Sequence, residues 1–468
     1  MLIRNQMLGD GEQEIPKSRF STTQIIAIGF IILIAVGTVL LSMPFVTVDG
    51  QAMPVIDALF TATSSSCVTG LVTVPTFSHW NLGGQIVILL LIQFGGLGVV
   101  TFTTLFLIIL GKRITIRQRL LIQDAYNLET LSGLVRTSLR VLKSALIVEG
   151  IGAVLYMFVF IPEYGILPGI WRSVFNAVSA FCNAGMDVLG ANSLVPYSGN
   201  VLVNLTTCGL IIMGGLGFVV WWDIGKGIRK FVKDRSIKLF FRKLTLHTKI
   251  VLAMTALFIF GGALLILIFD FNHPDSLGPM PLGEKILCAL FQSVTTRTAG
   301  FLTVPQENFT NATQLLSMLL MFIGGSPGGT AGGVKTITVA MLYLCVIAMI
   351  KGRKDPEVFA RKIPAEYVMK GITVILVNLT MLIFSTIALA ATQDGTLLDQ
   401  MYETASAIGT VGLSRSYTPS LDFFGKLVII LTMYVGRIGP ITLALSFNSR
   451  ARRKPVNRKL PEEKIMVG

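Results

Sequence analysis

The sequence predicts an all-α polytopic membrane protein of four units, each a span, a re-entrant pore helix and a second span, which gives eight transmembrane spans. Three observations support this prediction. The 468 residues are 52% hydrophobic and only 14% charged, whereas a soluble protein of this size has about 25% charged residues. The apolar residues gather in eight long blocks. Similar glycine-bearing motifs recur between these blocks at a nearly fixed period.

Each apolar block is long enough to cross a bilayer, which takes about 20 apolar residues in a helix. The blocks are residues 24–44, 84–111, 144–162, 200–222, 250–269, 313–350, 367–391 and 424–447. The first block follows 23 polar-rich residues, and no small-residue cleavage site comes after it. We therefore expect a retained span and not a signal peptide.

The net charge of +14 is distributed as in a membrane protein. Of 39 lysines and arginines, 32 fall in five segments that alternate with segments almost free of basic residues: 1–23, 112–143, 226–249, 351–370 and 450–464. Basic segments stay on the cytoplasmic side, so we expect a multi-pass protein of the cell inner (plasma) membrane with both termini in the cytoplasm. Nucleic acid is not an expected partner. A minority of these cations would suit contact with anionic membrane lipid or with an acidic partner.

A motif with a glycine near its end recurs once in each unit. The four copies read SSSCVTGL (64–71), AFCNAGMD (180–187), VTTRTAGF (294–301) and SAIGTVGL (406–413). Their glycines, Gly70, Gly185, Gly300 and Gly412, lie 115, 115 and 112 residues apart. A second glycine mark follows each after 24 to 29 residues, at Gly95-Gly96, Gly214-Gly215, Gly324-Gly325 and Gly436. A single glycine is typical of a tight turn or close helix packing, but four in register indicate a repeat.

A short amphipathic block precedes each motif, at residues 55–67, 171–182, 284–296 and 398–409. Each is too short to cross the bilayer and fits a half-helix that enters from the outer side, where its charged start lies. Non-helical backbone at membrane depth must line water or be buried in protein. Four such segments predict one central pore with pseudo-fourfold symmetry. There, loop carbonyls replace a cation's hydration shell and helix C-termini add negative partial charge.

Residues 324–336 read GGSPGGTAGGVKT and lie inside the apolar run 313–350. A phosphate-binding loop needs glycine directly before its lysine, and Val334 separates Gly333 from Lys335, so nucleotide binding is not predicted here. A glycine-rich packing face and an unwound loop remain. Proline costs a helix about 3 kcal/mol and each glycine about 1 kcal/mol relative to alanine. One helix over this run would also be about 57 Å long, nearly twice the bilayer core. We therefore expect a loop that obstructs the pore below the glycine motifs.

Two basic residues, Lys335 and Arg437, are part of this hypothesis. Lys335 either snorkels to the interface or contributes to the gate. Arg437, in YVGRIGP, lies halfway along the last span, where a charge costs at least about 2.5 kcal/mol and should face water or a partner. We expect Arg437 to face the pore, to raise the barrier to cations and to tether the loop. The predicted gate comprises Gly324, Gly325, Ser326, Pro327, Gly328, Gly329, Thr330, Ala331, Gly332, Gly333, Lys335 and Arg437.

The predicted organisation follows the repeat. It is a cytoplasmic N-terminal segment (1–23), repeat 1 (24–143), repeat 2 (144–249), repeat 3 (250–366) with the gating loop (324–333), repeat 4 (367–449) and a basic cytoplasmic tail (450–468).

With these motifs, the chain from about residue 22 to 450 resembles the Trk/Ktr/HKT potassium transporter superfamily. The likeness is greatest to the Ktr branch and its KtrB membrane subunit. The TrkH branch fits less well, because its members carry two further spans before the first repeat, whereas 23 residues precede the first span here. The resemblance implies that K⁺ is bound by carbonyls of Val68, Thr69, Gly70, Asn183, Ala184, Gly185, Thr298, Ala299, Gly300, Thr410, Val411 and Gly412.

The resemblance implies further properties. In the plant HKT relatives a serine in place of the first filter glycine accompanies sodium preference, so Gly70 favours potassium. Only one glycine per loop is shared with the channel signature TVGYG, so selectivity should be looser. The chain would be the pore-forming subunit of a potassium uptake system and a homodimer. A cytosolic ring of nucleotide-binding (RCK/KTN-type) subunits would regulate it, near the basic tail, and Na⁺ would stimulate it. K⁺ is then the substrate ion, and no cofactor is expected on this chain.

Other functions remain less well supported. A secondary transporter coupled to H⁺ or Na⁺ is the alternative, but it predicts inverted repeats and paired intramembrane acids. Here the units run in one direction, and Glu149 is an isolated acid that is either a proton relay or structurally paired. An enzyme needs a convergent cluster, and the three histidines lie in loops or flanks, so no enzyme is predicted. We expect the five cysteines to be small buried apolar residues without disulfide or metal roles.

The sequence also leads to expectations for one further arginine and for five acidic residues. Arg297, three residues before Gly300, should brace its loop through backbone hydrogen bonds. Five acids are expected on or near the outer face, where they either concentrate cations or are simply solvated: Asp187, Asp270, Asp275, Asp394 and Asp399.

Overall fold

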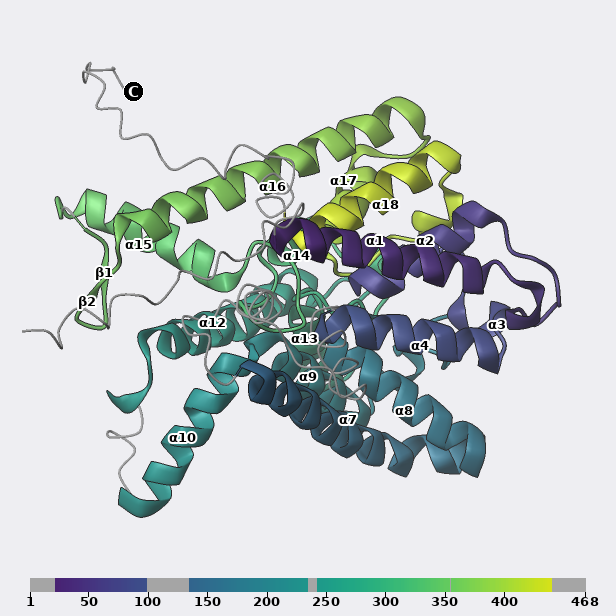
Figure 1. Cartoon of the computed structure of the whole chain (residues 1–468), viewed down its shortest axis with the longest axis horizontal. Helices are drawn as coiled ribbons and strands as arrows, with labels where there is room; N and C mark the ends of the chain where they lie inside the picture. Colours follow the sequence, from purple (N-terminus) through teal and green to yellow (C-terminus); the bar gives the residue numbers. More distant parts are fainter. Residues whose placement is uncertain (1–21, 99–133, 235–241, 354, 440–468) are drawn as a thin grey trace, which may run out of the picture.

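The structure is a computed structural model that describes residues 22–98, 134–234, 242–353 and 355–439 (Figure 1). Nearly all of the predicted N-terminal segment and the whole basic tail lie outside the described residues. Helices dominate the described chain. The exception is a small antiparallel ribbon of β1 (Glu357–Val358) and β2 (Arg361–Lys362). The prediction of a helical protein is confirmed apart from this ribbon.

Four long apolar helices, one near the start of each predicted unit, are the candidate membrane spans. They are α1 (Thr22–Leu41), α7 (Leu134–Tyr164), α12 (Leu246–Asp270) and α16 (Ala365–Thr392). Their most apolar windows have mean hydropathies of 2.1 to 2.7, and no more than a third of each window is buried inside the protein. Side chains such as Phe158 and Phe260 are 69% and 68% exposed. Apolar surface on this scale is unstable in water, so these helices face lipid.

Four shorter helices correspond to the predicted re-entrant blocks, and we call them half-helices. They are α2 (Val55–Cys67), α8 (Ile166–Cys182), α13 (Leu282–Thr295) and α17 (Leu397–Gly409). Proline stands at the N-cap of α2 and α13, and a capping box joins Thr396 to Asp399 at the start of α17. Helix α8 begins five residues before the predicted block, because Gly165, with φ 84°, ends α7 and lets the new helix start at once.

The second apolar helix of each unit ends at a glycine before it has crossed a bilayer's thickness. These helices are α4 (Leu82–Leu97), α9 (Val201–Leu216), α14 (Asn311–Ile323) and α18 (Phe423–Ile438). The terminating residues Gly98, Gly217, Gly324 and Gly439 all have positive φ. After Gly217 the chain continues in α10 (Phe218–Asp234), bent by 100° from α9. After Gly324 it stays non-helical until α15 (Thr336–Ile350).

The described residues therefore contain four helices with the length and composition of a span, or five if the bent pair of α9 and α10 counts as one. The sequence predicts eight, and the second apolar helix of each unit is the one that falls short of span length among the described residues. The blocks 84–111 and 424–447 also continue beyond the described residues. The break predicted in the run 313–350 is present between Ile323 and Thr336.

Packing of the half-helices closes a circle. Each contacts the long helix of its own unit and the second helix of the preceding unit, in the pairs α4–α8, α9–α13, α14–α17 and α18–α2. The last pair joins the fourth unit to the first, and Figure 1 shows yellow α18 beside purple α1 and α2. The Tyr434 hydroxyl on α18 donates to the Ala27 carbonyl on α1 at 3.0 Å. This closure brings the C-terminal ends of the four half-helices to one place.

Short helical turns make the remaining connections: η1 (Pro44–Val46), α3 (Thr76–His79), η2 (Val195–Tyr197), η3 (Gln306–Asn308) and η4 (Thr418–Ser420).

Candidate functional site

The four glycine motifs meet at the centre of the circle of half-helices. In each motif the glycine lies against a carbonyl of the next loop, in the pairs Gly70–Ala184, Gly185–Ala299, Gly300–Val411 and Gly412–Thr69. A Cβ atom added to any of these glycines would come within 3.0 Å of that carbonyl oxygen. The loops thus touch in chain order, and the fourth touches the first. We call residues 68–70, 183–185, 298–300 and 410–412 the glycine ring.

The chain reverses sharply to form each part of the glycine ring. The residue two places before each glycine is left-handed: Val68 (φ 56°), Asn183 (63°), Thr298 (67°) and Thr410 (50°). Such backbone costs non-glycine residues about 1–3 kcal/mol and collects at functional sites. After α2, the N–H groups of Val68 and Thr69 bond back to the carbonyls of Ser65 and Ser64, at 3.2 and 2.8 Å. The same helix-capping pattern follows α8 and α17.

Serine hydroxyls of two half-helices hold the glycine N–H groups away from the ring. The Gly70 N–H donates to Ser64 Oγ and the Gly412 N–H donates to Ser406 Oγ, both at 3.0 Å. Because the C=O and N–H of one peptide unit point in opposite directions, this bond turns the preceding carbonyl toward the ring. In unit 2 the equivalent Ser179 instead donates to the Met186 carbonyl at 2.5 Å.

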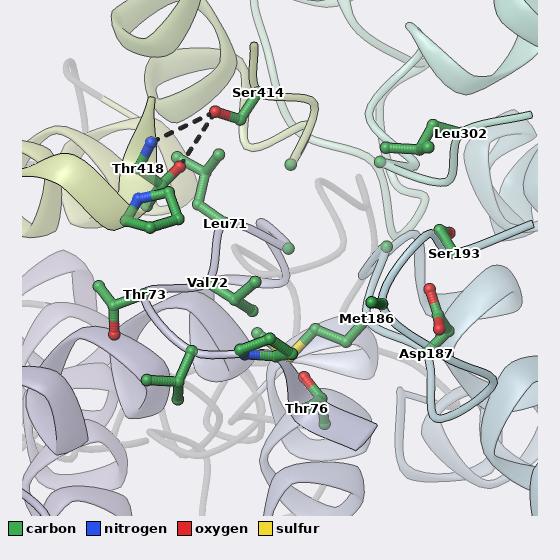
Figure 2. A pocket seen from close by; sticks show the side chains of 18 of the residues that line it. Leu71, Val72, Thr73, Thr76, Met186, Asp187, Ser193, Leu302, Ser414 and Thr418 are labelled. Atoms are coloured by element: carbon green, nitrogen blue, oxygen red, sulfur yellow. Dashed lines mark hydrogen bonds between the residues drawn. The ribbon is translucent and has the colours of Figure 1, made fainter. Parts of the chain in front are cut away.

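A cavity of about 250 Å³ opens at the ring, and all four motif glycines line it. Its wall includes the residue two places after each glycine, Val72, Asp187, Leu302 and Ser414. Figure 2 shows these four side chains arriving from different parts of the chain. Asp187 is the single acid among the described lining residues, and its carboxylate accepts from the Leu189 N–H at 3.2 Å.

Residues 324–333, which we call the central loop, contact the first residue of the ring segment in three units. The Gly332 N–H donates to Thr298 Oγ at 3.3 Å. The Thr330 hydroxyl lies 3.1 Å from the Phe181 carbonyl and 3.3 Å from Asn183 Oδ1. An added Cβ at Gly332 would also overlap the Thr410 hydroxyl. The central loop therefore touches the ring in units 2, 3 and 4.

The same loop is hydrogen-bonded to the backbone at the break between α9 and α10. The N–H groups of Ser326 and Thr330 donate to the carbonyls of Gly215 and Gly214, at 3.0 and 3.1 Å. In return the Phe218 N–H, the first of α10, donates to the Gly328 carbonyl at 3.1 Å. These bonds satisfy polar backbone that would otherwise be exposed at membrane depth.

The two predicted cations both contact the central loop. The Arg437 guanidinium donates to the Thr330 carbonyl at 2.5 Å and to the Gly95 carbonyl on α4 at 2.6 Å. It therefore links the loop to α4 and α18. The Lys335 ammonium folds back onto the Ala331 and Gly332 carbonyls, at 2.5 and 3.1 Å. Lysine at φ 83° is unusual, and these bonds help to hold it there.

The second glycine marks serve a different purpose in three units. A Cβ on Gly95, Gly214 or Gly436 would lie within 3.0 Å of a carbonyl near the end of the unit's own half-helix, at Ser66, Phe181 and Ile408 respectively. These glycines therefore permit close helix packing, one of the two roles that are typical of a single glycine. In unit 3, by contrast, Gly324 and Gly325 begin the central loop.

A tetrapeptide that we did not single out in the sequence ends the second helix in units 1, 2 and 4 and directly precedes α15 in unit 3. It reads GGLG at 95–98 and 214–217, GGVK at 332–335 and GRIG at 436–439. Its last residue has nearly the same backbone in all four units, with φ from 83° to 91° and ψ from 130° to 137°. Residues 324–331 thus amount to an insertion before this turn in unit 3. The recurrence of GGLG was the signal that could have located it.

Some charged residues lie otherwise than expected. The Arg297 guanidinium donates to Thr255 Oγ at 3.3 Å and not to its own loop, because the side chain turns toward α12. Asp270 is fully buried and not solvated, since it accepts hydrogen bonds from Ser276, Thr310 and Thr313. For Glu149 the structure shows the structural pairing that was one of the two expected alternatives, because both carboxylate oxygens accept from Gln93 Nε2 at 3.1 Å.

The chemistry available at the glycine ring is electrostatic. Its twelve residues carry no charged side chain, and they present backbone carbonyls at the C-terminal ends of four half-helices. Helix C-termini carry partial negative charge, so the ring favours cations over anions. The long lipid-facing helices and this central ring define the class of the protein, a helical multi-pass membrane protein.

Comparisons with known proteins agree with this class. The family described as TrkH, cation transport protein, matches residues 8–454. The potassium/sodium uptake protein NtpJ of Enterococcus hirae is 42% identical over 97% of this chain and 98% of its own length. The Ktr system potassium uptake protein B is 37% identical in Bacillus subtilis, over 96% of this chain and 97% of its own, and 35% identical in Vibrio alginolyticus, over 98% and 97%.

A crystal structure of the potassium transporter TrkH from Vibrio parahaemolyticus shares the fold, with a TM-score of 0.71, 18% identity and coverage of 95% of this chain and 88% of the other. This chain belongs to the family of cation transport proteins that is described as TrkH, and it is more similar to the two Ktr proteins, at 37% and 35% identity, than to the TrkH of known structure, at 18%. It is a transporter and not an enzyme, and the predicted superfamily resemblance is confirmed.

Proposed function

We propose that this chain is the pore-forming subunit of a potassium uptake system and that K⁺ crosses the membrane through the glycine ring. The observation that carries the proposal is the closure of four loops, one from each unit, around a single cavity. The names of three relatives at 35 to 42% identity, each a potassium or potassium/sodium uptake protein, support the substrate class.

The twelve residues of the glycine ring are the K⁺ filter in this proposal. Their carbonyls replace the water ligands of the ion, and the ends of α2, α8, α13 and α17 add negative potential at the same place. The serine bonds to the N–H groups of Gly70 and Gly412 support this role, because they turn carbonyls toward the ring.

The central loop, with Lys335 and Arg437, is the gate. The loop lies against the ring, and its two neighbouring cations raise the energy of a K⁺ ion that passes. Arg437 keeps the loop in place through its bond to Thr330, and it anchors that bond on α4 through Gly95. Loss of these bonds would let the loop move aside and open the pathway.

The surrounding architecture in this proposal is a pseudo-fourfold arrangement of eight transmembrane spans around one central pore. The cyclic contacts of α2, α8, α13 and α17 support it. The basic segments 112–143, 226–249 and 351–370 then lie in the cytoplasm together with both termini, in the inner (plasma) membrane.

Regulation comes from other subunits in this proposal. Two of the relatives carry the name of a Ktr system component, which supports a system of more than one subunit. We place a cytosolic ring of nucleotide-binding (RCK/KTN-type) subunits against the basic cytoplasmic segments of a homodimer of this chain. Na⁺ acts as an activator, and anionic membrane lipid covers the remaining cations.

Uptake measurements test the proposal. The chain is expressed in cells that lack K⁺ uptake, alone and with a candidate regulatory subunit, and Rb⁺ and Na⁺ entry are measured against cells with an empty vector. We expect Rb⁺ entry that exceeds Na⁺ entry and rises with the partner. Absence of Rb⁺ entry at verified membrane expression would overturn the proposal. Entry that stops when the proton or sodium gradient is removed at constant membrane potential would favour the coupled transporter.

A further inference from the structure

A buried cluster of polar side chains joins the central loop to the glycine ring. Asn183 Nδ2 lies 3.3 Å from the Arg297 carbonyl and 3.4 Å from Thr298 Oγ, while Asn183 Oδ1 lies 3.3 Å from the Thr330 hydroxyl. Thr298 Oγ also accepts from the Gly332 N–H. We call Asn183, Thr298 and Thr330 the Asn183 cluster. At most 1% of each of these residues is exposed, so water cannot replace a lost bond.

The cluster attaches the central loop to the glycine ring in two of the four units. In unit 1 the position equivalent to Asn183 is Val68, which has no polar side chain. In unit 4 it is Thr410, whose hydroxyl has no hydrogen-bond partner among the described residues. The loop is therefore hydrogen-bonded to the side chains of the ring in units 2 and 3. A movement of the loop acts on those two units first.

Each ring member of the cluster is bonded both to the loop and to the neighbouring unit. The Asn183 carboxamide holds the Arg297 carbonyl of unit 3 on one side and the Thr330 hydroxyl on the other. When the loop leaves, Asn183 Oδ1 loses its donor, and Thr298 Oγ loses the Gly332 N–H. A buried polar group without a partner is unfavourable, so both side chains would rotate to find new partners. Their strained left-handed backbone, at φ 63° and 67°, would lose its support.

We propose that Asn183 and Thr298 are positioning residues that make the ion selectivity of the ring depend on the position of the central loop. With the loop in place, the ring carbonyls of units 2 and 3 are held in register and the ring discriminates K⁺ from Na⁺. With the loop displaced, this discrimination falls. The inference rests on the proposed function and adds a regulation of selectivity to it.

A first experiment removes one hydroxyl of the cluster. Thr298→Val keeps the side-chain shape but removes the acceptor for Gly332 and Asn183, whereas Thr298→Ser restores a hydroxyl. We expect Thr298→Val to lower the ratio of Rb⁺ to Na⁺ uptake by about three- to tenfold, the range expected from the loss of one to two buried hydrogen bonds. Thr298→Ser should return the ratio toward that of the wild type. A control, Thr207→Val, removes a buried hydroxyl that bonds Tyr156 and the Val203 carbonyl away from the ring, and it should leave the ratio unchanged.

A second experiment displaces the loop without touching the ring. The bonds of the Arg437 guanidinium go to carbonyls of Thr330, Gly95 and Gly96. Arg437→Ala should therefore increase the rate of Rb⁺ uptake and also lower the Rb⁺/Na⁺ ratio. In the double variant, Thr298→Val should lower the ratio by less than it does alone, because its bond to the Gly332 N–H is already broken and only the contact with Asn183 remains to be lost.

The outcomes separate this inference from the function on which it rests. Faster uptake with an unchanged ratio in Arg437→Ala would overturn the coupling and leave the gate intact. Additive losses of selectivity in the double variant would also overturn it. If Thr298→Val fails to reach the membrane, the Rb⁺/Na⁺ ratio of Arg437→Ala alone still tests the coupling. A wild type that carries no Rb⁺ would overturn the proposed function itself.

Discussion

Replacement of Gly70 by serine should abolish most of the discrimination between K⁺ and Na⁺. Gly70 has φ 101°, and an added Cβ would lie 2.5 Å from the Ala184 carbonyl oxygen and 3.2 Å from the Gly412 Cα. Both contacts are backbone atoms of neighbouring loops, which cannot rotate away as a side chain could. The strained backbone costs about 1–3 kcal/mol, and the overpacking costs a further 1–3 kcal/mol or so. Even a total of about 2 kcal/mol changes an equilibrium about 30-fold.

The assay is competitive uptake of Rb⁺ and Na⁺ at matched membrane abundance of the two proteins. Gly50→Ser is the matched control, because Gly50 also has positive φ, at 67°, but an added Cβ would have no atom within 4 Å. We expect the control to keep the ratio of the wild type, while Gly70→Ser lowers it by more than tenfold. An unchanged ratio in Gly70→Ser would refute the filter assignment. The four glycines would then be explained by close packing.

Three further predictions follow from single contacts. Arg437→Ala removes a charge-assisted bond worth about 1.5–3 kcal/mol, so Rb⁺ uptake should rise by at least about tenfold, and equal or slower uptake at equal expression would contradict the gate. Ser406→Ala leaves the Gly412 N–H without its acceptor and should lower the Rb⁺/Na⁺ ratio several-fold, whereas the exposed Ser420→Ala should not. Asp270→Ala removes the acceptor of three hydroxyl groups and one N–H, so we expect the free energy of unfolding to fall by about 2–4 kcal/mol. The loss would be measured as a lower Tm in detergent. An effect no larger than that of the exposed Asp275→Ala would show that this network is dispensable.

The sequence alone was sufficient for features that depend on local chemistry. Long apolar blocks predicted the lipid-facing helices α1, α7, α12 and α16, because the transfer of apolar surface into lipid does not depend on distant contacts. The half-helix α2 ends where predicted, because the left-handed backbone after it is a local turn. Pro327 and its glycines predicted the interruption between α14 and α15, because their cost to a helix is intrinsic.

Features that depend on neighbours could not be predicted in the same way. The sequence could not show that α9 turns by 100° at Gly217, since the bend is completed by bonds to the central loop of another unit. The partner of Arg297 was predicted wrongly for a similar reason. Its guanidinium reaches Thr255, 42 residues earlier in the chain, because α12 packs behind that loop.

What the sequence by itself determined is the set of parts: lipid-length helices, four repeated half-helices, and glycines at positions where the backbone must be left-handed or closely packed. The tertiary structure decided how these parts meet. The contact of α18 with α2 closes the circle of half-helices, and Arg437 reaches the Gly95 carbonyl across 342 residues of sequence. Such contacts arise only when all four units pack around a common centre. The carbonyl that each glycine faces, and the side chains that hold the central loop, are therefore properties of the assembled fold.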